Sequence, residues 1–448
     1  MPKLVHPFRG FKLGSRVGLP VRLLAAALIA TGLLVAASGP AAAATVLYVN
    51  QSSASCNDSG AGTQAAPFCT INKAASVATA GQTVQVASGT YNELVTVAHS
   101  GTAAAPVTLT AASGASVTVS GKADGFKLAS KSYVVVQNFT VTGTTSYGIL
   151  VSGSSQVTLR GNHVSNAGQR ASGLTKYGIR LQATTASLVS GNVAFNNSDA
   201  GIFLDGTTSG VRVTGNTTYG NARGYTRAAP GIDVRGHNNT IDRNVSHNNE
   251  DSGLQFYTGS HDNLVVDNLS YRNGDHGIDD LHATGQRIIS NTVYGNVTAG
   301  INVEGTSTGA TIENNLSVDN GVNSPRTKSN LRVDSTSTSG ATVNYNLVYL
   351  SVSGQVMYVW GSKSYSSLAA FQAATGQESH GRQANPGWVS TGSNFHLKAG
   401  SPAIDSANAA ASGETATDLA GKARADDPAT ANTGAGARAY DDRGAYEF

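Results

Sequence analysis

Acidic, histidine and tyrosine side chains are most concentrated between residues 250 and 285 of the sequence. Asp251 stands two residues before Gly253, and Asp275 stands two residues before Gly277. In both places the glycine opens a short segment that contains apolar residues and is short enough to be a strand. Recurrence at this fixed interval indicates stacked structural repeats, which would bring the two carboxylates close together.

A third carboxylate, Asp279, lies in the segment that follows Asp275. Carboxylates that stack at this spacing repel one another unless a cation lies between them, and hard oxygen ligands suit Ca²⁺. We therefore expect Asp251, Asp275 and Asp279 to bind calcium. The alternative is that all three are solvated aspartates in turns.

Four side chains near these carboxylates are candidates for proton transfer: Arg235, Tyr257, His276 and His282. A histidine can accept a proton at its ordinary pKa, whereas Arg and Tyr need a strongly cationic or desolvated setting to act as bases. We predict that these four residues form the catalytic centre.

The repeat that positions these residues covers most of the second half of the chain. A Gly or Asn followed by a short strand pattern recurs every 22 to 30 residues, at Gly148, Gly178, Gly201, Gly231, Gly253, Gly277, Gly300 and Asn330. A second marker recurs in step, at Asn162, Asn192, Asn216, Asn244, Asn268, Asn291, Asn315 and Asn346. Short coils of this length predict an all-β fold, a right-handed parallel β-helix. The asparagines are expected to form an internal hydrogen-bonding ladder.

Alternation within each opening strand assigns its faces. The first and third residues after the glycine are expected in the core, for example Ile232, Val234, Leu254 and Phe256. The second and fourth residues then form an exposed polar strip. From this strip we expect substrate contacts from Arg180, Asp233, Gln255 and Glu304.

One strand departs from this alternation, because Asp280 holds a position that is apolar in the other strands. Either Asp280 is paired inside the core, or a one-residue bulge places Leu281 in the core and turns Asp280 and His282 outward. We favour the bulge, which would make Asp280 a further substrate-binding residue.

Three repeats carry extra residues at the same phase, at 167–177, 222–230 and 321–329. Insertions at one phase emerge on one side of a solenoid, commonly its binding side. These insertions carry the cations Arg170, Lys176, Arg223, Arg227, Arg326 and Lys328. A row of cations suits an anionic ligand, and we expect Lys176 and Arg227 to contact it.

The N-terminal residues 1–44 have the pattern of a secretory signal peptide, with basic residues, an apolar run and a small-residue cleavage site. We therefore expect a secreted, extracellular protein with no membrane association after cleavage. Without residues 1–44 the chain has 25 basic and 27 acidic residues, which gives no support for nucleic-acid binding. Export also favours a disulfide between the only cysteines, Cys56 and Cys69.

Residues 45–448 are expected to form a single domain. An N-terminal cap and first coils are expected in 45–121, the main coils in 122–350 and a covering segment in 351–448. Short helices are predicted near 71–78, where one would cap the open end of the solenoid, and near 366–375.

The segment from Asp251 to Asp279 resembles the family-nine pectate lyases, which are secreted right-handed β-helix proteins. Their calcium site uses D-x-G-[LI]-Q and D-D-G-x-D turns, and this chain has DSGLQ at 251–255 and DHGID at 275–279. His276 replaces one of the four carboxylates. The lyases also carry a catalytic Lys in the next coil, where this chain has Asn302.

The resemblance implies a monomeric enzyme that cleaves an acidic, uronate-containing polysaccharide by Ca²⁺-assisted β-elimination. Three alternatives remain open on the same fold. The first is a glycoside hydrolase that uses paired carboxylates such as Asp233 and Asp279, and the second is a uronan C5-epimerase. The third is a non-catalytic carbohydrate-binding protein of the cell surface.

Overall fold

Each sequence repeat forms one coil of three short strands, and each strand joins one of three sheets. The computed structural model describes residues 45–168, 176–222 and 229–448. Within these ranges each sheet has twelve strands, all parallel except for the antiparallel pair at one end of one sheet. The predicted parallel β-helix is therefore confirmed.

We name each sheet by its first strand. The β4 sheet contains β4 (Val95–Thr96), β7 (Phe126–Ala129), β10 (Ile149–Ser152), β13 (Ile179–Gln182), β16 (Ile202–Leu204), β19 (Ile232–Val234), β22 (Leu254–Phe256), β25 (Ile278–Leu281), β28 (Ile301–Glu304), β31 (Leu331–Asp334), β34 (Tyr358–Gly361) and β35 (Lys363–Tyr365). The β1 sheet contains β1 (Val46–Val49), β2 (Thr83–Val86), β5 (Val107–Ala111), β8 (Val134–Gln137), β11 (Thr158–Arg160), β14 (Leu188–Ser190), β17 (Arg212–Thr214), β20 (Thr240–Asp242), β23 (Leu264–Val266), β26 (Arg287–Ile289), β29 (Thr311–Glu313) and β32 (Thr342–Asn344).

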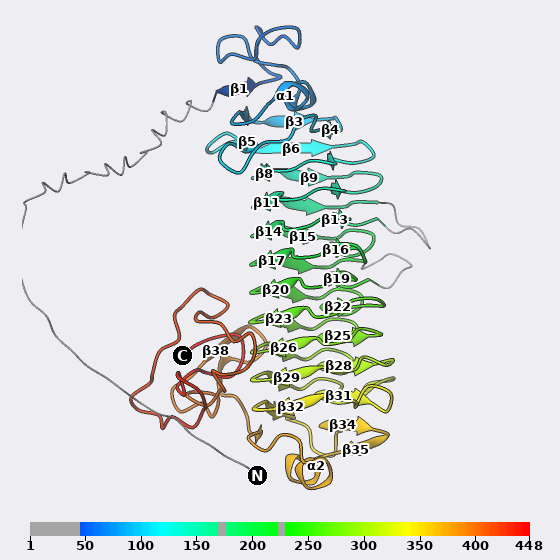
Figure 1. Cartoon of the computed structure of the whole chain (residues 1–448), viewed down its shortest axis with the longest axis vertical. Helices are drawn as coiled ribbons and strands as arrows, with labels where there is room; N and C mark the ends of the chain where they lie inside the picture. Colours follow the sequence, from blue (N-terminus) through cyan, green and yellow to red (C-terminus); the bar gives the residue numbers. More distant parts are fainter. Residues whose placement is uncertain (1–44, 169–175, 223–228) are drawn as a thin grey trace, which may run out of the picture. The chain divides into compact units, whose positions relative to one another are not determined.

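The β3 sheet contains β3 (Gly89–Tyr91), β6 (Val117–Ser120), β9 (Thr140–Thr142), β12 (His163–Ser165), β15 (Val193–Phe195), β18 (Thr217–Tyr219), β21 (Val245–His247), β24 (Leu269–Tyr271), β27 (Thr292–Tyr294), β30 (Leu316–Val318), β33 (Leu347–Tyr349) and β36 (Arg382–Gln383). The coils stack in chain order, from cyan at β5 to yellow at β32 (Figure 1).

The core follows the alternation predicted from the sequence. Ile232, Val234, Leu254 and Phe256 are at most 1% exposed, and they belong to one apolar cluster that runs through the coils. Register places Ile232 beside Leu254 and Val234 beside Phe256. The predicted inward positions are confirmed, and the strand register is therefore correct.

The recurring asparagines form the predicted ladder along the inside of the coils. The Asn268 side chain donates to Asn291 Oδ1 at 2.9 Å and to the Ile241 carbonyl at 2.8 Å, and its own Oδ1 accepts from the Asn244 side chain at 3.0 Å. At the last coil Asn346 donates to Glu378 Oε1 at 2.9 Å, so a carboxyl group ends the series. The ladder satisfies buried polar groups that would otherwise be costly.

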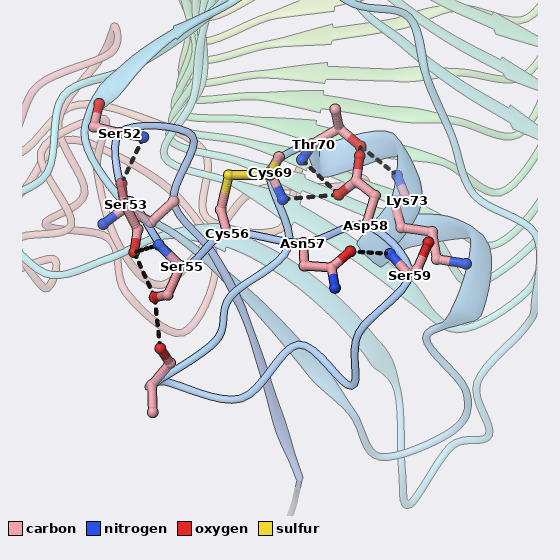
Figure 2. Close-up of a disulfide and its surroundings, with 12 residues drawn as sticks. Ser52, Ser53, Ser55, Cys56, Asn57, Asp58, Ser59, Cys69, Thr70 and Lys73 are labelled. Atoms are coloured by element: carbon pink, nitrogen blue, oxygen red, sulfur yellow. Dashed lines mark hydrogen bonds between the residues drawn. A yellow bond between two sulfur atoms is a disulfide. The ribbon is translucent and has the colours of Figure 1, made fainter.

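The N-terminal end is closed by α1 (Ile71–Val77), close to the predicted helix. Its N-cap Thr70 is held by Asp58, whose carboxylate also accepts from the backbone N–H of Cys69 at 2.7 Å (Figure 2). The predicted disulfide between Cys56 and Cys69 is present beside this contact. The disulfide and the Asp58 hydrogen bonds therefore fix the loop that starts the cap.

The C-terminal segment closes the other end and covers one face. In α2 (Leu368–Thr375), which confirms the second predicted helix, Phe371 is fully buried and stacks on Tyr358 at 4.3 Å between ring centroids. The hairpin of β37 (Trp388–Ser390) and β38 (Asn394–Leu397) then packs with strands of the β3 sheet in a second apolar cluster. None of the helices in the described ranges is long and apolar enough to cross a membrane.

We expect Asn268→Ala to lower the free energy of unfolding by about 1–3 kcal/mol, because it removes ladder hydrogen bonds and leaves the neighbouring amides buried without partners. Thr258→Ala, in an exposed turn of the same coil, is the control and should change stability little. Urea unfolding followed by circular dichroism measures both. Equal stability of the two variants would show that the ladder does not hold the coils together.

Candidate active site

The outer face of the β4 sheet carries the polar row predicted from the sequence. Register places Asp233 beside Gln255, Gln255 beside Asp279, and Asp279 beside Asn302. Asp233, Asp279 and Asn302 are nevertheless at most 4% exposed. The predicted exposure of Asp233 is therefore wrong, although its register is right. Strands about 4.8 Å apart bring outer side chains into contact, so short side chains in the row are covered by their neighbours.

One end of the row combines arginines with aromatic rings. The Tyr177 ring stacks on Phe203 at 4.2 Å and on Tyr147 at 6.0 Å between centroids. The Arg180 guanidinium lies 5.0 Å from the Tyr147 ring centroid. Burial raises the pKa of the Tyr177 hydroxyl well above its ordinary value, so this phenol stays protonated.

Arg235 joins this aromatic group to the carboxylates. Its guanidinium lies 5.2 Å from the Phe203 ring centroid and 5.0 Å from that of Tyr257, distances that allow cation–π attraction. It also donates to Asp233 Oδ2 at 3.0 Å. Arg235 and Tyr257 are half-buried, where the sequence predicted exposure.

A second asparagine ladder, which the sequence analysis did not separate from the first, positions the carboxylate turns. Asn249 donates to Asn273 at 3.0 Å, Asn273 to Asn296 at 3.0 Å, and Asn296 to Asn320 at 2.8 Å, each from Nδ2 to Oδ1. The first three of these asparagines stand two residues before Asp251, Asp275 and Thr298 respectively. The ladder therefore aligns these three side chains in successive coils.

Burial and neighbouring negative charges together act on the Asp251 carboxyl group. The pKa of Asp251 is raised to about 7 by burial and by the negative charges of Asp275, Asp279 and Glu250. In the described ranges Asp251 makes no ion pair with a basic side chain, and it accepts a hydrogen bond from the Ser252 hydroxyl at 3.3 Å. The charges of Asp275 and Asp279 act on Asp251, as expected for neighbouring carboxylates, and calcium binding by these three residues stays a prediction.

Asp275 and His276 are joined through Thr298. The Thr298 hydroxyl makes short hydrogen bonds with Asp275 Oδ1 and, at 2.8 Å, with His276 Nδ1. A hydroxyl has one proton to donate, so donation to Asp275 assigns the imidazole proton to Nδ1. Asn302 Nδ2 then donates to the lone pair of His276 Nε2 at 3.3 Å. His276 is 4% exposed and is held from both sides.

Asp279 lies at the centre of the site. It accepts from Asn302 Nδ2 at 2.8 Å and from Gln255 Nε2 at 3.3 Å, and burial raises its pKa. One ligand atom each from His276, Asp279 and Glu304 lie within 4.8 Å of one another. Glu304 is neutralised by Arg332, which approaches it to 2.5 Å.

The residues present fit a hard divalent cation. Asp251, Asp275 and Asp279 offer carboxylate oxygens, the ligands that Ca²⁺ prefers. In the described ranges neither Asp251 nor Asp279 makes an ion pair with a lysine or arginine. The Glu304 carboxylate and the His276 imidazole lie close to Asp279 at the same place, although calcium prefers oxygen to nitrogen.

The predicted bulge at Asp280 is wrong. Strand β25 pairs without interruption on both sides, with Asp280 beside Phe256 and Val303. Asp280 is therefore fully buried in the core, and it cannot contact a ligand on the outer face, whereas Leu281 is half-buried outside the core. Continuous backbone pairing on both edges leaves no room for an extra residue. Burial, and after it the negative charge of Asp279, raises the pKa of Asp280 well above its ordinary value.

Of the remaining predicted residues, His282 and Lys176 are described by the structure and Arg227 is not. His282 is exposed in a turn after β25, with a φ of 55°, and Lys176 lies with its Nζ 5.2 Å from the Tyr147 ring centroid. Arg227, with the insertion cations Arg170 and Arg223, lies outside the described residues.

Four residues of the site were not among the predicted site residues: Thr298, Asn302, Arg326 and Arg332. Thr298 stands two residues before Gly300, at the phase of Asp251 and Asp275, so the repeat contained a signal for it. Asn302 and Arg332 were at outward strand positions. Arg326 could not be placed from sequence, because the path of an insertion is not set by the repeat.

Comparison with known proteins gives one family match. The profile described as "Right handed beta helix region" matches residues 68–218, 103–269 and 217–368, which together span more than half of the chain. YwoF of Bacillus subtilis (strain 168), described as an uncharacterized protein, is 27% identical over 443 residues. That match covers 80% of this chain and 92% of YwoF.

Two solved structures share the fold at low sequence identity. Pectate lyase Pel9A matches with a TM-score of 0.57 and 18% identity, over 90% of this chain and 96% of its own. The complex of XylC with xylose matches with a TM-score of 0.54 and 14% identity, over 68% of this chain and 76% of its own. At these identities the likeness shows the fold alone.

Replacement of the buried carboxyl group by an alkyl group in Asp280→Val should stabilise the fold, and more at pH 8 than at pH 5. When folding raises the pKa of an aspartate, the protein loses stability as the pH rises from the pKa of the unfolded state, about 3.9, towards the pKa of the folded state. Urea unfolding at both pH values measures the change. Asp262→Asn removes an exposed carboxylate and should leave the pH dependence unaltered. A variant less stable than the wild type at pH 8 would contradict this account.

Proposed function

This chain belongs to the right-handed β-helix family, and from that premise we propose that it cleaves an acidic, uronate-containing polysaccharide by Ca²⁺-assisted β-elimination. The observation that carries the proposal is the recurrence of Asp251 and Asp275 in the turns that precede β22 and β25, next to Asp279 on the outer face of β25. Uronate elimination requires a cation to neutralise the substrate carboxylate, and these residues are arranged to hold one.

The outer face of the β4 sheet suits a chain of sugar acids. Aromatic rings can pack against sugar rings, and Tyr147 and Tyr257 supply them beside the cations Arg180 and Arg235. Adjacent strands lie about 4.8 Å apart, so a row that extends from Arg180 to Arg332 can contact several sugar units. Pectate lyase Pel9A shows that this fold is compatible with polysaccharide elimination.

The reaction removes the C5 proton of a uronate and breaks the bond from C4 to the leaving oxygen. The electrons of the C5–H bond form the C4=C5 double bond, and the leaving oxygen takes up a proton. When bound, Ca²⁺ would stabilise the negative charge that develops on the uronate carboxylate. Asp251, Asp275 and Asp279 would hold that ion.

We assign the two proton transfers to His282 and Tyr257. The register of β22 and β25 places Phe256 beside Asp280, so Tyr257 and His282 follow these residues in adjacent coils. His282 is exposed, and an imidazole is the side chain most often used to accept a proton, so we assign the C5 proton to it. The Tyr257 phenol can donate a proton to the leaving oxygen, while Arg235 lies over its ring and holds it in place. We assign His276 a positioning role, because its ring is hydrogen-bonded to Thr298 and Asn302.

Glycoside hydrolysis is a second candidate, because the surroundings of Asp279 favour its protonated form and those of Asp233 favour its ionised form. Burial raises the pKa of Asp279, as in a general acid, while Arg235 forms an ion pair with Asp233, as expected for a carboxylate that stays ionised. They stand two strands apart, about 9.6 Å, close to the upper limit of about 9.5 Å for inverting glycosidases. Hydrolysis would give new reducing ends without a double bond.

We propose that the protein acts outside the cell. The pattern of residues 1–44 supports export, and the disulfide between Cys56 and Cys69 suits an oxidising compartment. A polymeric substrate that cannot enter the cell would be met there.

Calcium should raise the melting temperature of the wild type, because an ion that binds only the folded state stabilises it by mass action. At a calcium concentration of one hundred times Kd the gain is about 2.7 kcal/mol. Asp251→Asn should lose most of this shift, whereas Asp262→Asn should retain it. Differential scanning calorimetry with calcium and with chelator measures the effect. Identical melting curves in the two conditions would remove calcium from the proposal.

Activity is tested on pectate, alginate, glucuronan and glycosaminoglycans by the ultraviolet absorbance of the unsaturated uronate. On a polymer that the wild type cleaves, Tyr257→Phe and His282→Ala should each lower kcat by about 10²-fold or more while the fold is retained. Thr258→Ala is the control, since it lies beside Tyr257 in an exposed turn. Full activity of both variants would place the proton transfers elsewhere. Cleavage without new absorbance would indicate hydrolysis.

A further inference from the structure

Arg326 connects an insertion of the solenoid to the carboxylate cluster. Its Nη2 lies 2.9 Å from Asp275 Oδ1, and its side chain is 61% exposed, whereas that of Asp275 is 15% exposed. Arg326 belongs to the insertion between β30 and β31, two coils beyond Asp275. A long side chain therefore reaches back past Thr298 to bring a positive charge to the cluster.

The insertion is held in place independently of this ion pair. Its Asn323 backbone N–H donates to Gln355 Oε1 at 3.0 Å, and Gln355 Nε2 donates back to Asn323 Oδ1 at 3.2 Å. The Ser324 hydroxyl accepts from the Arg326 backbone N–H at 3.2 Å. The base of the Arg326 side chain is thus fixed, and only the flexible part of the side chain has to move for the ion pair to open.

Arg326 supplies the positive charge beside Asp275 that a bound metal ion would otherwise supply. Asp251 and Asp279 make no ion pair with a lysine or arginine in the described ranges, and Arg332 is engaged with Glu304 and Asn302. Arg326 therefore contributes the lysine or arginine charge nearest to Asp275 among the described residues. An ion pair exposed on one side is weak, because water screens it and the long side chain loses freedom in making it.

We propose that Arg326 is a tethered counter-ion that neutralises Asp275 in the metal-free protein and is displaced when calcium binds. The inference rests on the calcium site of the proposed function and deepens it by naming what sets calcium affinity. A guanidinium and a divalent ion cannot share the same carboxylate oxygen at contact distance without strong repulsion. On this proposal calcium binds Asp275 with the Arg326 side chain displaced into solvent, where most of that side chain already lies.

The first test is calcium binding by isothermal titration calorimetry in the absence of substrate. Because displacement of Arg326 opposes binding, Arg326→Ala should bind calcium about three- to tenfold more tightly than the wild type. Lys328→Ala removes an exposed cation from the same insertion and should bind with wild-type affinity. In chelator Arg326→Ala should melt at a lower temperature than the wild type, and the difference should shrink at saturating calcium.

A double-mutant comparison locates the effect. In an Asp275→Asn background, Arg326→Ala should no longer change calcium affinity, since the carboxylate for which the two cations compete is absent. Equal or weaker binding by Arg326→Ala in the wild-type background would overturn the inference while leaving the calcium site intact. Absence of calcium binding to the wild type would overturn both the inference and the calcium part of the proposed function. Elimination activity, measured separately, would still decide the reaction.

Discussion

Stacking of parallel coils at one fixed spacing is the constraint on which the rest of this structure depends. Every backbone hydrogen bond between coils requires the same register, and that register then repeats every side-chain position along the axis. Side chains at one phase must therefore interact with others at the same phase. The identity of the residue decides whether that interaction stabilises the fold or opposes it.

Three kinds of side-chain stack in this structure show how the residue type decides the effect of stacking. Asparagines such as Asn268 both donate and accept, so a stack of them satisfies itself through the interior. Aromatic rings such as Tyr177 and Phe203 stack face to face on the outside. Carboxylates have no donor when ionised, so a stack such as Asp251 and Asp275 does not satisfy itself, and burial together with the neighbouring negative charges raises the pKa of Asp251.

The covering elements decide which stacks remain accessible. The helices α1 and α2 pack at the two ends of the coils, and the segment around Phe395 packs on the β3 sheet. Arg443, which is 1% exposed, donates to backbone carbonyls of the tail and of the last coils and fixes this segment in place. The carboxylates, arginines and aromatic rings of the proposed site lie instead on the β4 sheet. The β3 sheet is therefore covered by packing that stabilises the fold, while the β4 sheet carries the residues of the proposed site.

The sequence by itself determined the period, the sheet faces and the core, because alternation and repeated Gly and Asn reflect local backbone geometry and burial. It also aligned Asp251 with Asp275 and Gln255 with Asp279, since residues at one phase of a solenoid must stack. Only the tertiary structure decided how deeply each side chain is buried, and so Asp233 is covered and Asp280 lies in the core without a bulge. It also decided that Arg326 reaches Asp275, because an insertion is not bound by the repeat and its course depends on contacts distant in sequence.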